Sequence, residues 1–341
     1  MSEVVKRKGI KVSKKKGEPT RRVLIEKGLL DASAKIFSSN GFLFLPILKQ
    51  PVNSEFFEIK QVSNDFIVGD YEFELMEKSP TFEDLLGYIP HYEIVGDIAI
   101  VDEDDESEAR KIADAIIRLH PNIKTVVGTT APIGGEYRVR NVKVIAGEDR
   151  TETIHKEHGC RYVVDIAEAY FTPRLSTERE RVLSLISSRD LVVDMFAGVG
   201  PYSILIAKKV DVKKVIAIDK NPTAVRFLRR NIELNSVNNV VAIEGDAGDK
   251  EQELEGIADH VIMNLPHSAE EFLNAAVNIT KPGGIIHYYD ITPEDDLFDS
   301  SLELIRNAAN YKGRQIEVVN KRVVRSYAPH EFNICIEVKV N

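Results

Sequence analysis

The second half of the chain alternates short apolar runs with amphipathic segments, and this alternation restricts the possible folds more than any other feature of the sequence. The apolar runs occupy residues 191–195, 215–218, 240–243, 260–263 and 284–289, and the segments with helical periodicity occupy 202–209, 224–235, 269–280 and 302–309. Alternation of this kind, which begins near Ser176, predicts a doubly wound parallel sheet with helices on both faces. The last two apolar runs, 315–324 and 332–340, have no helical pattern between them, so we expect an antiparallel hairpin at the sheet edge.

The residues before this alternation predict two smaller α+β units joined by a linker at 76–80. The first unit has one helical pattern at 20–30 and two short apolar runs at 42–48 and 56–59. The second has a helical pattern at 107–119 and strand-like segments at 97–101, 125–128, 137–145 and 154–166. The expected fold class is α/β, with a Rossmann-like C-terminal domain over 166–341 preceded by domains over 1–75 and 76–165.

Composition places the chain among ordinary soluble proteins. It has 341 residues, of which 43% are hydrophobic, and no apolar run approaches the length of a membrane span. The charged N-terminus lacks the apolar stretch of a secretory signal, and the two cysteines, Cys160 and Cys335, form no CxxC pair. We therefore expect a cytoplasmic protein without disulfides, a structural zinc site or contact with a membrane.

Charge is distributed unevenly along the chain. The formal net charge is −9, yet residues 1–27 contain ten lysines and arginines and three glutamates, a balance of +7. A second cluster, at 102–108, is acidic. Charge alone leaves open whether the basic segment binds phosphates or is a solvated tail.

A glycine turn follows the first strand of the alternating region. Asp194 ends that strand, and Gly198 and Gly200 precede the next helix, an arrangement that lets a ligand approach the backbone. A dinucleotide fingerprint would need a third glycine where this chain has Ser203. Asp219 and Asp246 end the next two strands. Each carboxylate alone could cap a helix, but three of them around one turn favour a ligand site.

The sequence D-x-F-x-G-x-G at 194–200 resembles the first motif of class I methyltransferases, which bind S-adenosylmethionine at this turn. The resemblance implies that Asp219 accepts the ribose hydroxyls and that Asp246 lies beside the adenine. The full set of implied cofactor-binding residues is Asp194, Phe196, Gly198, Gly200, Asp219, Lys220, Asp246, Ala247 and Asn264.

Asn264-Leu265-Pro266-His267 ends the fourth strand and is similar to the Asn-Pro-Pro-aromatic motif of enzymes that methylate nitrogens of nucleobases. Taken alone, it could equally be a strand end with a turn. Methylation of a pyrimidine carbon would require a cysteine nucleophile, and neither cysteine falls near the carboxyl ends of these strands. The motif therefore favours a base nitrogen as the methyl acceptor.

A closer resemblance covers nearly the whole chain. Its motifs are Gly17–Arg22, Gly135–Arg140, Thr153–Glu157, Tyr170–Leu175 with Glu178 and Arg179, Asp194–Pro201, Asn264–Pro266 and Ser326–Pro329. Together they resemble the archaeal tRNA (guanine-N1)-methyltransferases that modify guanosine 37, just 3′ of the anticodon. The resemblance implies a monomeric enzyme acting on tRNA, with a basic N-terminal domain that contacts the tRNA elbow.

The same resemblance implies a role for individual residues. Guanine N1 carries a proton at neutral pH, so a base must remove it and a cation must stabilise the charge that moves to O6. The family's pattern assigns these roles to Glu178 and Arg138, and Asn264 would hold the guanine edge. Further substrate contacts are expected from Tyr170, Arg174, Arg179, Pro266 and Arg140. From the residues alone, Glu178 is an ordinary first-turn carboxylate and Arg138 and Arg140 are ordinary strand residues on one face.

Other functions remain open at this stage. His155, His158 and Cys160 have a metal-like spacing, but a hairpin at 158–159 explains it more simply, and we expect no metal ion. Within the same fold, the rivals are the aminocarboxypropyltransferase and the methyltransferase of wyosine synthesis. From a different class, the chain could be a tRNA-binding protein without activity.

Overall fold

The structure is a computed structural model that describes residues 3–76, 80–135 and 137–341. It divides the chain into two compact units, Met1–Thr81 and Phe82–Asn341. The first predicted boundary, at 75/76, lies close to this division, whereas residues 77–79 of the predicted linker lie outside the described residues. No helix in the described part of the chain is long and apolar enough to cross a membrane.

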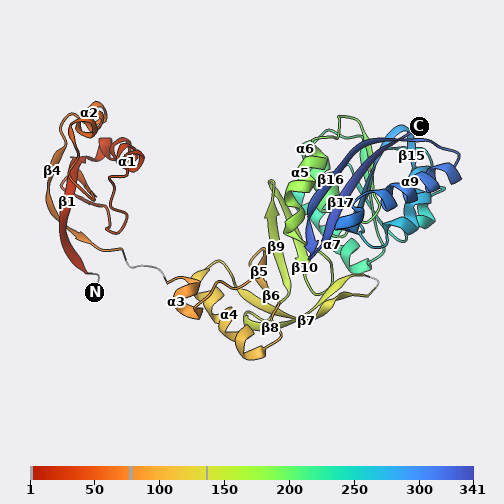
Figure 1. The fold of residues 1–341 in the computed structure, drawn as a ribbon, viewed down its shortest axis with the longest axis horizontal. Coiled ribbons are helices and arrows are strands. Elements are labelled where there is room, and N and C mark those ends of the chain that lie inside the picture. Colours follow the sequence, from red (N-terminus) through yellow and green to blue (C-terminus); the bar gives the residue numbers. More distant parts are fainter. Residues whose placement is uncertain (1–2, 77–79, 136) are drawn as a thin grey trace. The chain divides into compact units, whose positions relative to one another are not determined.

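The first unit is a four-stranded sheet in the order β2-β3-β1-β4 with two helices packed on it (Figure 1). Its elements are β1 (Val4–Ser13), α1 (Gly17–Glu26), β2 (Phe37–Ser39), β3 (Phe42–Pro46), α2 (Asn53–Val62) and β4 (Ile67–Glu74). The core joins sheet to helices through Ile10, Val12, Leu24 and Ile59. The apolar run at 56–59 lies in α2, a second helix that the sequence did not predict, because so short a run carries no usable periodicity.

The second unit begins with a mixed four-stranded sheet in the order β5-β6-β7-β8. Its elements are α3 (Phe82–Leu86), β5 (Tyr92–Val95), β6 (Ile98–Val101), α4 (Glu106–Leu119), β7 (Thr125–Gly134) and β8 (Val139–Gly147). Asp105 caps α4 by accepting a hydrogen bond from the Glu108 amide at 2.8 Å. The helix buries Ile112 and Ile116 against this sheet. The mixed sheet and its helix agree with the prediction.

A hairpin of β9 (Glu152–Glu157) and β10 (Cys160–Asp165) connects this sheet to the rest of the unit. Its turn places His158 and Gly159 at positive φ, as expected for a tight two-residue connection. The side chain of Asn231, in α7 (Pro222–Asn235), accepts a hydrogen bond from the Val163 amide and donates one to the Val163 carbonyl, which ties the hairpin to that helix. The predicted boundary at 165/166 thus follows a strand that packs on the last domain, and it stays a prediction.

The largest sheet has seven strands in the order β13-β12-β11-β14-β15-β17-β16. The strands are β11 (Leu191–Asp194), β12 (Lys214–Asp219), β13 (Val240–Glu244), β14 (Ala258–Met263), β15 (Thr280–Pro293), β16 (Ile316–Ala328) and β17 (Glu331–Val340). The helices are α5 (Ser176–Leu183), α6 (Pro201–Lys209), α7 (Pro222–Asn235), α8 (Leu273–Ile279) and α9 (Asp299–Tyr311). Figure 1 shows β16 and β17 side by side, and they form the predicted antiparallel hairpin at the sheet edge.

The strand order reverses direction between β11 and β14, because β12 lies on one side of β11 and β14 on the other. Open parallel sheets bind ligands at such a reversal, outside the carboxyl ends of the strands. The predicted helix at 269–280 differs in detail, since its first turn, Ala269–Phe272, is a 3-10 helix and α8 starts at Leu273. This turn follows the Asn264 motif and helps to shape the pocket described next.

Candidate active site

A pocket of about 550 Å³ lies over the carboxyl ends of the central strands of the large sheet. Residues from the smaller mixed sheet and from the β16–β17 hairpin complete its walls. Most of the residues that the sequence predicted for the site line this pocket, namely Arg138, Arg140, Tyr170, Arg174, Arg179, Phe196, Gly198, Asp219, Lys220, Asp246, Ala247, Asn264 and Pro266. Three do not, namely Glu178, Asp194 and Gly200.

Asp219 organises the side of the pocket formed by β11 to β13, which we call the loop side. Its carboxylate accepts hydrogen bonds from the amide of Gly198 at 2.6 Å and from the amide of Asn221 at 2.9 Å. Burial raises the pKa of Asp219. A carboxylate has about four lone-pair positions, so two remain for a ligand's hydroxyls. Gly198 has a φ of 54°, a conformation that favours glycine at this turn.

Asp246 and an aromatic pair complete the loop side. The Asp246 carboxylate accepts a hydrogen bond from the Gly248 amide at 2.8 Å and lies 3.5 Å from the Lys220 ammonium nitrogen. The rings of Phe196 and Phe272 meet edge to face, with centroids 5.0 Å apart, and both line the pocket. An apolar wall beside a carboxylate suits a flat heterocycle with an amino group.

Asp194 and Gly200 were expected to touch the cofactor, and the structure corrects this. Asp194 is 1% exposed and accepts a hydrogen bond from the Ser203 hydroxyl at 2.7 Å, and burial raises its pKa to about 7. Gly200 caps the N-terminus of α6 at a φ of 89°, and a Cβ there would clash with the Leu228 side chain. Both residues support the loop from beneath, because the helix packs too closely on the sheet to expose them.

Arg138 and Asn264 meet on the opposite side of the pocket, which we call the base side. Arg138 lies in a turn just before β8, at a φ of 51°, and its guanidinium donates a hydrogen bond to the Pro266 carbonyl. The expected alternation with Arg140 along one strand is therefore wrong, although both side chains line the pocket. Asn264 Oδ1 is buried without a hydrogen-bond partner among the described residues. Glu136, in the same motif as Arg138, lies outside the described residues.

A carboxylate that the sequence did not single out holds two of the predicted arginines. Glu93 on β5 forms an ion pair with Arg140 at 2.7 Å and lies 3.8 Å from Arg174 Nε. It also accepts a hydrogen bond from the Thr172 hydroxyl at 2.9 Å. A glutamate within the mostly apolar run 92–95 was the only signal for it. Tyr170 is half-exposed beside these charges, and burial raises the pKa of its hydroxyl.

Arg179 was expected to bind a tRNA phosphate, and its surroundings contradict this. The side chain is 2% exposed and donates two hydrogen bonds to Glu157, at 2.7 and 2.6 Å, and a third to the Thr172 carbonyl. Burial opposes ionisation of Glu157, but the bonds from Arg179 and His155 lower its pKa to about 2. Arg179 therefore anchors the segment before α5 and is not available to a phosphate.

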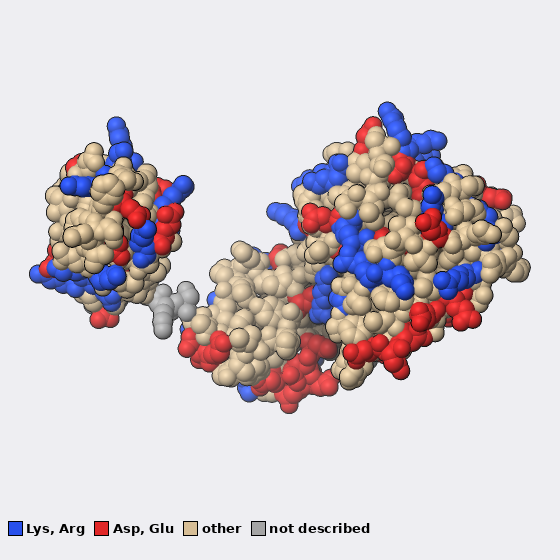
Figure 2. Space-filling view, turned by 45° about the horizontal axis from the view of Figure 1, so that its top comes forward, with Lys and Arg blue, Asp and Glu red and all other residues tan. Residues whose placement is uncertain are grey.

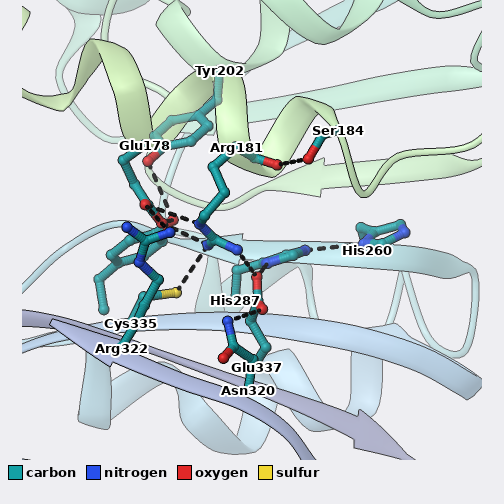
Figure 3. Close-up of polar contacts among 11 residues, drawn as sticks. Glu178, Arg181, Ser184, Tyr202, His260, His287, Asn320, Arg322, Cys335 and Glu337 are labelled. Atoms are coloured by element: carbon teal, nitrogen blue, oxygen red, sulfur yellow. Dashed lines mark hydrogen bonds and ion pairs between the residues drawn. The ribbon is translucent and has the colours of Figure 1, made fainter. Parts of the chain in front are cut away.

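Glu178 was expected to face the pocket, and the structure places it in a neighbouring buried cluster (Figure 3). Its side chain is 2% exposed and accepts hydrogen bonds from Arg181 at 2.6 and 3.0 Å and from the Tyr289 hydroxyl at 2.8 Å. The Tyr289 hydroxyl in turn accepts one from Tyr202 at 3.3 Å, and Tyr202 lines the pocket. Two tyrosine hydroxyls thus connect the pocket wall to the carboxylate.

Comparison with known proteins supports one family over the whole chain. Residues 153–319 match the model of the TRM5/TYW2 methyltransferase domain, 9–55 match the tRNA methyltransferase 5 N-terminal domain and 74–151 match the TYW2 N-terminal domain. The tRNA (guanine(37)-N(1))-methyltransferase Trm5b of Pyrococcus abyssi is 43% identical over 97% of this chain and 98% of its own length. The chain belongs to the TRM5/TYW2 methyltransferase family.

Two further members of the TRM5/TYW2 family bear on the site. The solved complex of aTrm5 and tRNALeu has a TM-score of 0.73 and 39% identity, and the match covers 98% of this chain and 99% of that one. The tRNA(Phe) (4-demethylwyosine(37)-C(7)) aminocarboxypropyltransferase of Methanocaldococcus jannaschii is 34% identical over 73% of this chain and 97% of its own length. The family therefore includes two transfer chemistries on related chains.

Figure 3 shows that the cluster around Glu178 continues through Arg181 and Glu337 to His287 and His260. Arg181 donates to Glu337 at 2.8 Å, Glu337 contacts His287 at 2.9 Å, and His287 contacts His260 at 3.0 Å. Burial lowers the pKa of His260 to about 3. Burial opposes ionisation of Glu337, but hydrogen bonds from His287 and Arg181 lower its pKa to about 2. Sequence patterns did not reveal this cluster, since its members come from four separate segments.

The metal-like spacing of His155, His158 and Cys160 falls in the β9–β10 hairpin, as expected for a turn at 158–159. In the described part of the chain, no group of three His, Cys, Asp or Glu side chains could hold a metal ion. His158 instead forms a hydrogen bond with the Ser176 hydroxyl at 2.9 Å, and both cysteines are free and buried. His267 packs edge to face on Tyr327, with ring centroids 5.4 Å apart, and burial together with Arg138 lowers its pKa.

Proposed function

We propose that this protein transfers a methyl group from S-adenosylmethionine to N1 of guanosine 37 in tRNA. The observation that carries the proposal is a single pocket in which Gly198 and Asp219 lie on one side and Arg138 reaches over the Asn264 turn on the other. Membership of the TRM5/TYW2 family and the activity named for the Pyrococcus abyssi relative support it.

The loop side fits S-adenosylmethionine. Asp219 would hold the ribose hydroxyls, Asp246 and the Phe196 ring would hold the adenine, and the open backbone at Gly198 would face the rest of the molecule. When bound, S-adenosylmethionine supplies a methyl group on a positively charged sulfur. On the base side, the buried Oδ1 of Asn264 has no hydrogen-bond partner among the described residues, and a bound molecule would satisfy it.

The base side would prepare the guanine. Arg138 donates one guanidinium N–H to the Pro266 carbonyl, and its other N–H groups would stabilise negative charge on O6. The Asn264 amide would hold the base edge beside N1. A base must be extruded from the anticodon loop to enter this pocket, and Tyr170 is placed to stack on it. In the balanced reaction, the carbon–sulfur bond breaks, an N1–carbon bond forms, and N1 loses its proton.

We propose that Glu178 receives this proton through Tyr202 and Tyr289, because its carboxylate does not line the pocket. Tyr202 donates to Tyr289 and Tyr289 donates to Glu178, so each hydroxyl can pass its proton on while it accepts another. Arg181 and Tyr289 already hold the carboxylate in one orientation. The relay leaves the tyrosines unchanged and the proton on Glu178, which would return it through the same two hydroxyls to solvent in the pocket after the product leaves.

The first unit would contact the tRNA elbow through its basic residues. Figure 2 shows basic side chains on its surface, and β1 and α1 carry most of the +7 segment. Lysines and arginines spread over a small surface suit contacts with the phosphate backbone. We also propose that the protein acts in the cytoplasm as a monomer. Arg174, which is exposed at the pocket rim, would contact a phosphate of the anticodon loop.

The proposal is tested by incubating the purified protein with S-adenosylmethionine and an unmodified tRNA transcript that carries guanosine 37, followed by nucleoside mass spectrometry. We expect 1-methylguanosine with the guanosine 37 transcript and no product with an adenosine 37 transcript. Methyl on guanine N2 or on a cytosine would overturn the proposed site. An aminocarboxypropyl product would instead favour the chemistry named for the Methanocaldococcus jannaschii relative. If calorimetric titration detected no binding of S-adenosylmethionine, the remaining hypothesis would be a tRNA-binding protein without activity.

A further inference from the structure

Three strands at the edge of the large sheet contribute a row of side chains to the pocket. Asn333 on β17 pairs with Ile291 on β15 and with Arg325 on β16. Residues directly opposite each other in antiparallel strands project from the same face of the sheet. All three line the pocket, although they are far from its motifs in the sequence. The hairpin at the sheet edge therefore forms one wall of the pocket.

Asn333 is a buried polar residue whose side-chain oxygen is not satisfied in the free protein. It is 2% exposed, and its Oδ1 has no hydrogen-bond partner among the described residues. Burying such an acceptor destabilises a protein by about 1–3 kcal/mol unless something satisfies it. Among the described side chains that line the pocket, Asn264 is the other residue with a buried oxygen in this condition. Both amides are placed for a ligand that donates hydrogen bonds.

The strand order decides which ligand Asn333 faces. The residues that fit S-adenosylmethionine follow β11, β12 and β13, whereas β15, β17 and β16 lie on the other side of β14. Arg325, beside Asn333, forms no ion pair with a described residue. Its guanidinium donates a hydrogen bond to the Ser326 carbonyl at 3.4 Å and lies 5.8 Å from the centre of the Tyr327 ring, and its Nε is buried without a partner among the described residues. An arginine without an acidic partner lies next to a buried amide oxygen without a hydrogen-bond partner, with an aromatic ring beside them. These groups are suited to bind a nucleotide and its phosphate.

We propose that Asn333 determines specificity for guanine by accepting a hydrogen bond from the exocyclic 2-amino group, with Arg325 binding the phosphate of the same nucleotide. The inference rests on the proposed function and deepens it. Asn264 holds the edge beside N1, and Asn333 reads the neighbouring amino group. Adenine lacks an amino group at this position, so Asn333 would also help to exclude it.

The test compares two tRNA transcripts that differ only at position 37, one with guanosine and one with inosine, which lacks the 2-amino group. For the unaltered protein, we expect kcat/KM to be about tenfold higher with guanosine, the effect of one hydrogen bond to a buried group. In Asn333→Leu, activity on guanosine should fall by a similar factor while activity on inosine stays nearly constant, so the preference disappears. Asn333→Asp keeps an acceptor and should keep the preference.

Two further variants separate recognition of the 2-amino group from effects that are common to both transcripts. Arg325→Ala should raise KM equally for both transcripts, because the phosphate is common to them. Val323→Ala, at an exposed position of the same strand outside the pocket lining, should change neither value. Binding of S-adenosylmethionine and the melting temperature report whether each variant is folded. An unchanged guanosine-to-inosine ratio in a folded Asn333→Leu would overturn the assignment, whereas an unaltered protein without activity on guanosine 37 would overturn the proposed function itself.

Discussion

The two sides of the pocket differ in how their polar groups are satisfied. On the loop side, Asp219 and Asp246 already accept backbone hydrogen bonds from Gly198, Asn221 and Gly248. The base side instead presents the buried oxygens of Asn264 and Asn333, which have no hydrogen-bond partner among the described residues, and Arg325, which forms no ion pair with a described residue. The polar groups of the loop side are therefore satisfied before any ligand arrives, whereas those of the base side are not, and in the proposed function a substrate would satisfy them.

This difference has a physical reason. A loop that binds the same small molecule in every turnover gains from being rigid, since ordering it on binding would weaken affinity. A side that receives an extruded base must leave donors and acceptors open, even though each open group destabilises the free protein. Unsatisfied polar atoms thus mark the substrate side more clearly than any sequence motif does.

The largest effect is expected from Arg138→Ala on the base side. Removing the group that stabilises charge on O6 should lower kcat by about 10³-fold with little change in affinity for S-adenosylmethionine. Arg138→Lys keeps the charge without the planar fork and should recover only part of the loss. Single-turnover methylation measures the first effect, and calorimetry measures the second. If the alanine variant lost cofactor affinity instead, the division into two sides would be wrong.

Glu178→Gln should lower kcat by about 10²-fold at neutral pH, a typical effect of removing a proton acceptor. Activity should recover as pH rises, because solvent then removes more of the N1 proton. The control is Tyr202→Phe, which keeps the ring in the pocket wall and removes the first hydroxyl of the relay. An inactive Glu178→Gln together with a fully active Tyr202→Phe would show that the proton does not pass through the tyrosines.

Asp219→Ala probes the loop side. We expect the Kd for S-adenosylmethionine to rise by about 30-fold, corresponding to about 2 kcal/mol of lost charge-assisted hydrogen bonds. Asp194→Asn is the matched control, because Asp194 lies beneath the loop and bonds Ser203 without lining the pocket. Calorimetric titration of both variants decides the matter. Equal losses in the two variants would contradict the separate places of these carboxylates.

The smallest effect concerns the buried cluster that contains Glu178, Glu337 and His260. The pKa of His260 is lowered to about 3 in the folded protein, so the unfolded chain binds more protons below pH 6.5. The pKa of Glu337 is lowered to about 2, and the stability that it contributes is lost as pH falls below 4.5. Both shifts predict a melting temperature that falls steadily from pH 6.5 toward pH 3.

Replacing His260 with Gln should flatten this dependence between pH 6.5 and pH 4. His330, which is exposed and pairs with Glu294, offers a control in His330→Gln. Differential scanning calorimetry across the pH range compares the three proteins. A steeper fall in the His260 variant would show that the buried histidine is charged in the folded protein.

Sequence patterns predicted the alternating half of the fold well, and failed where contacts between distant segments decide the outcome. Asp219, Asp246 and Asn264 were found because each ends a strand, and the ends of parallel strands gather at one edge. Glu178 was misplaced, since a motif shows which residues are near in sequence but not which way a side chain turns. Asn333 was missed because it lies in an ordinary strand and becomes notable only through its neighbours.

By itself, the sequence determined the layered α/β fold, the loop with its carboxylates and the family, since these depend on local periodicity and on short contiguous motifs. Only the tertiary structure decided which polar groups are satisfied and which remain open. Hydrogen bonds such as that from Arg138 to Pro266 join residues 128 positions apart, and burial of Glu178 and Asn333 depends on strands that meet only after folding. Satisfaction of a polar group is a property of its surroundings, and those exist only in the folded chain.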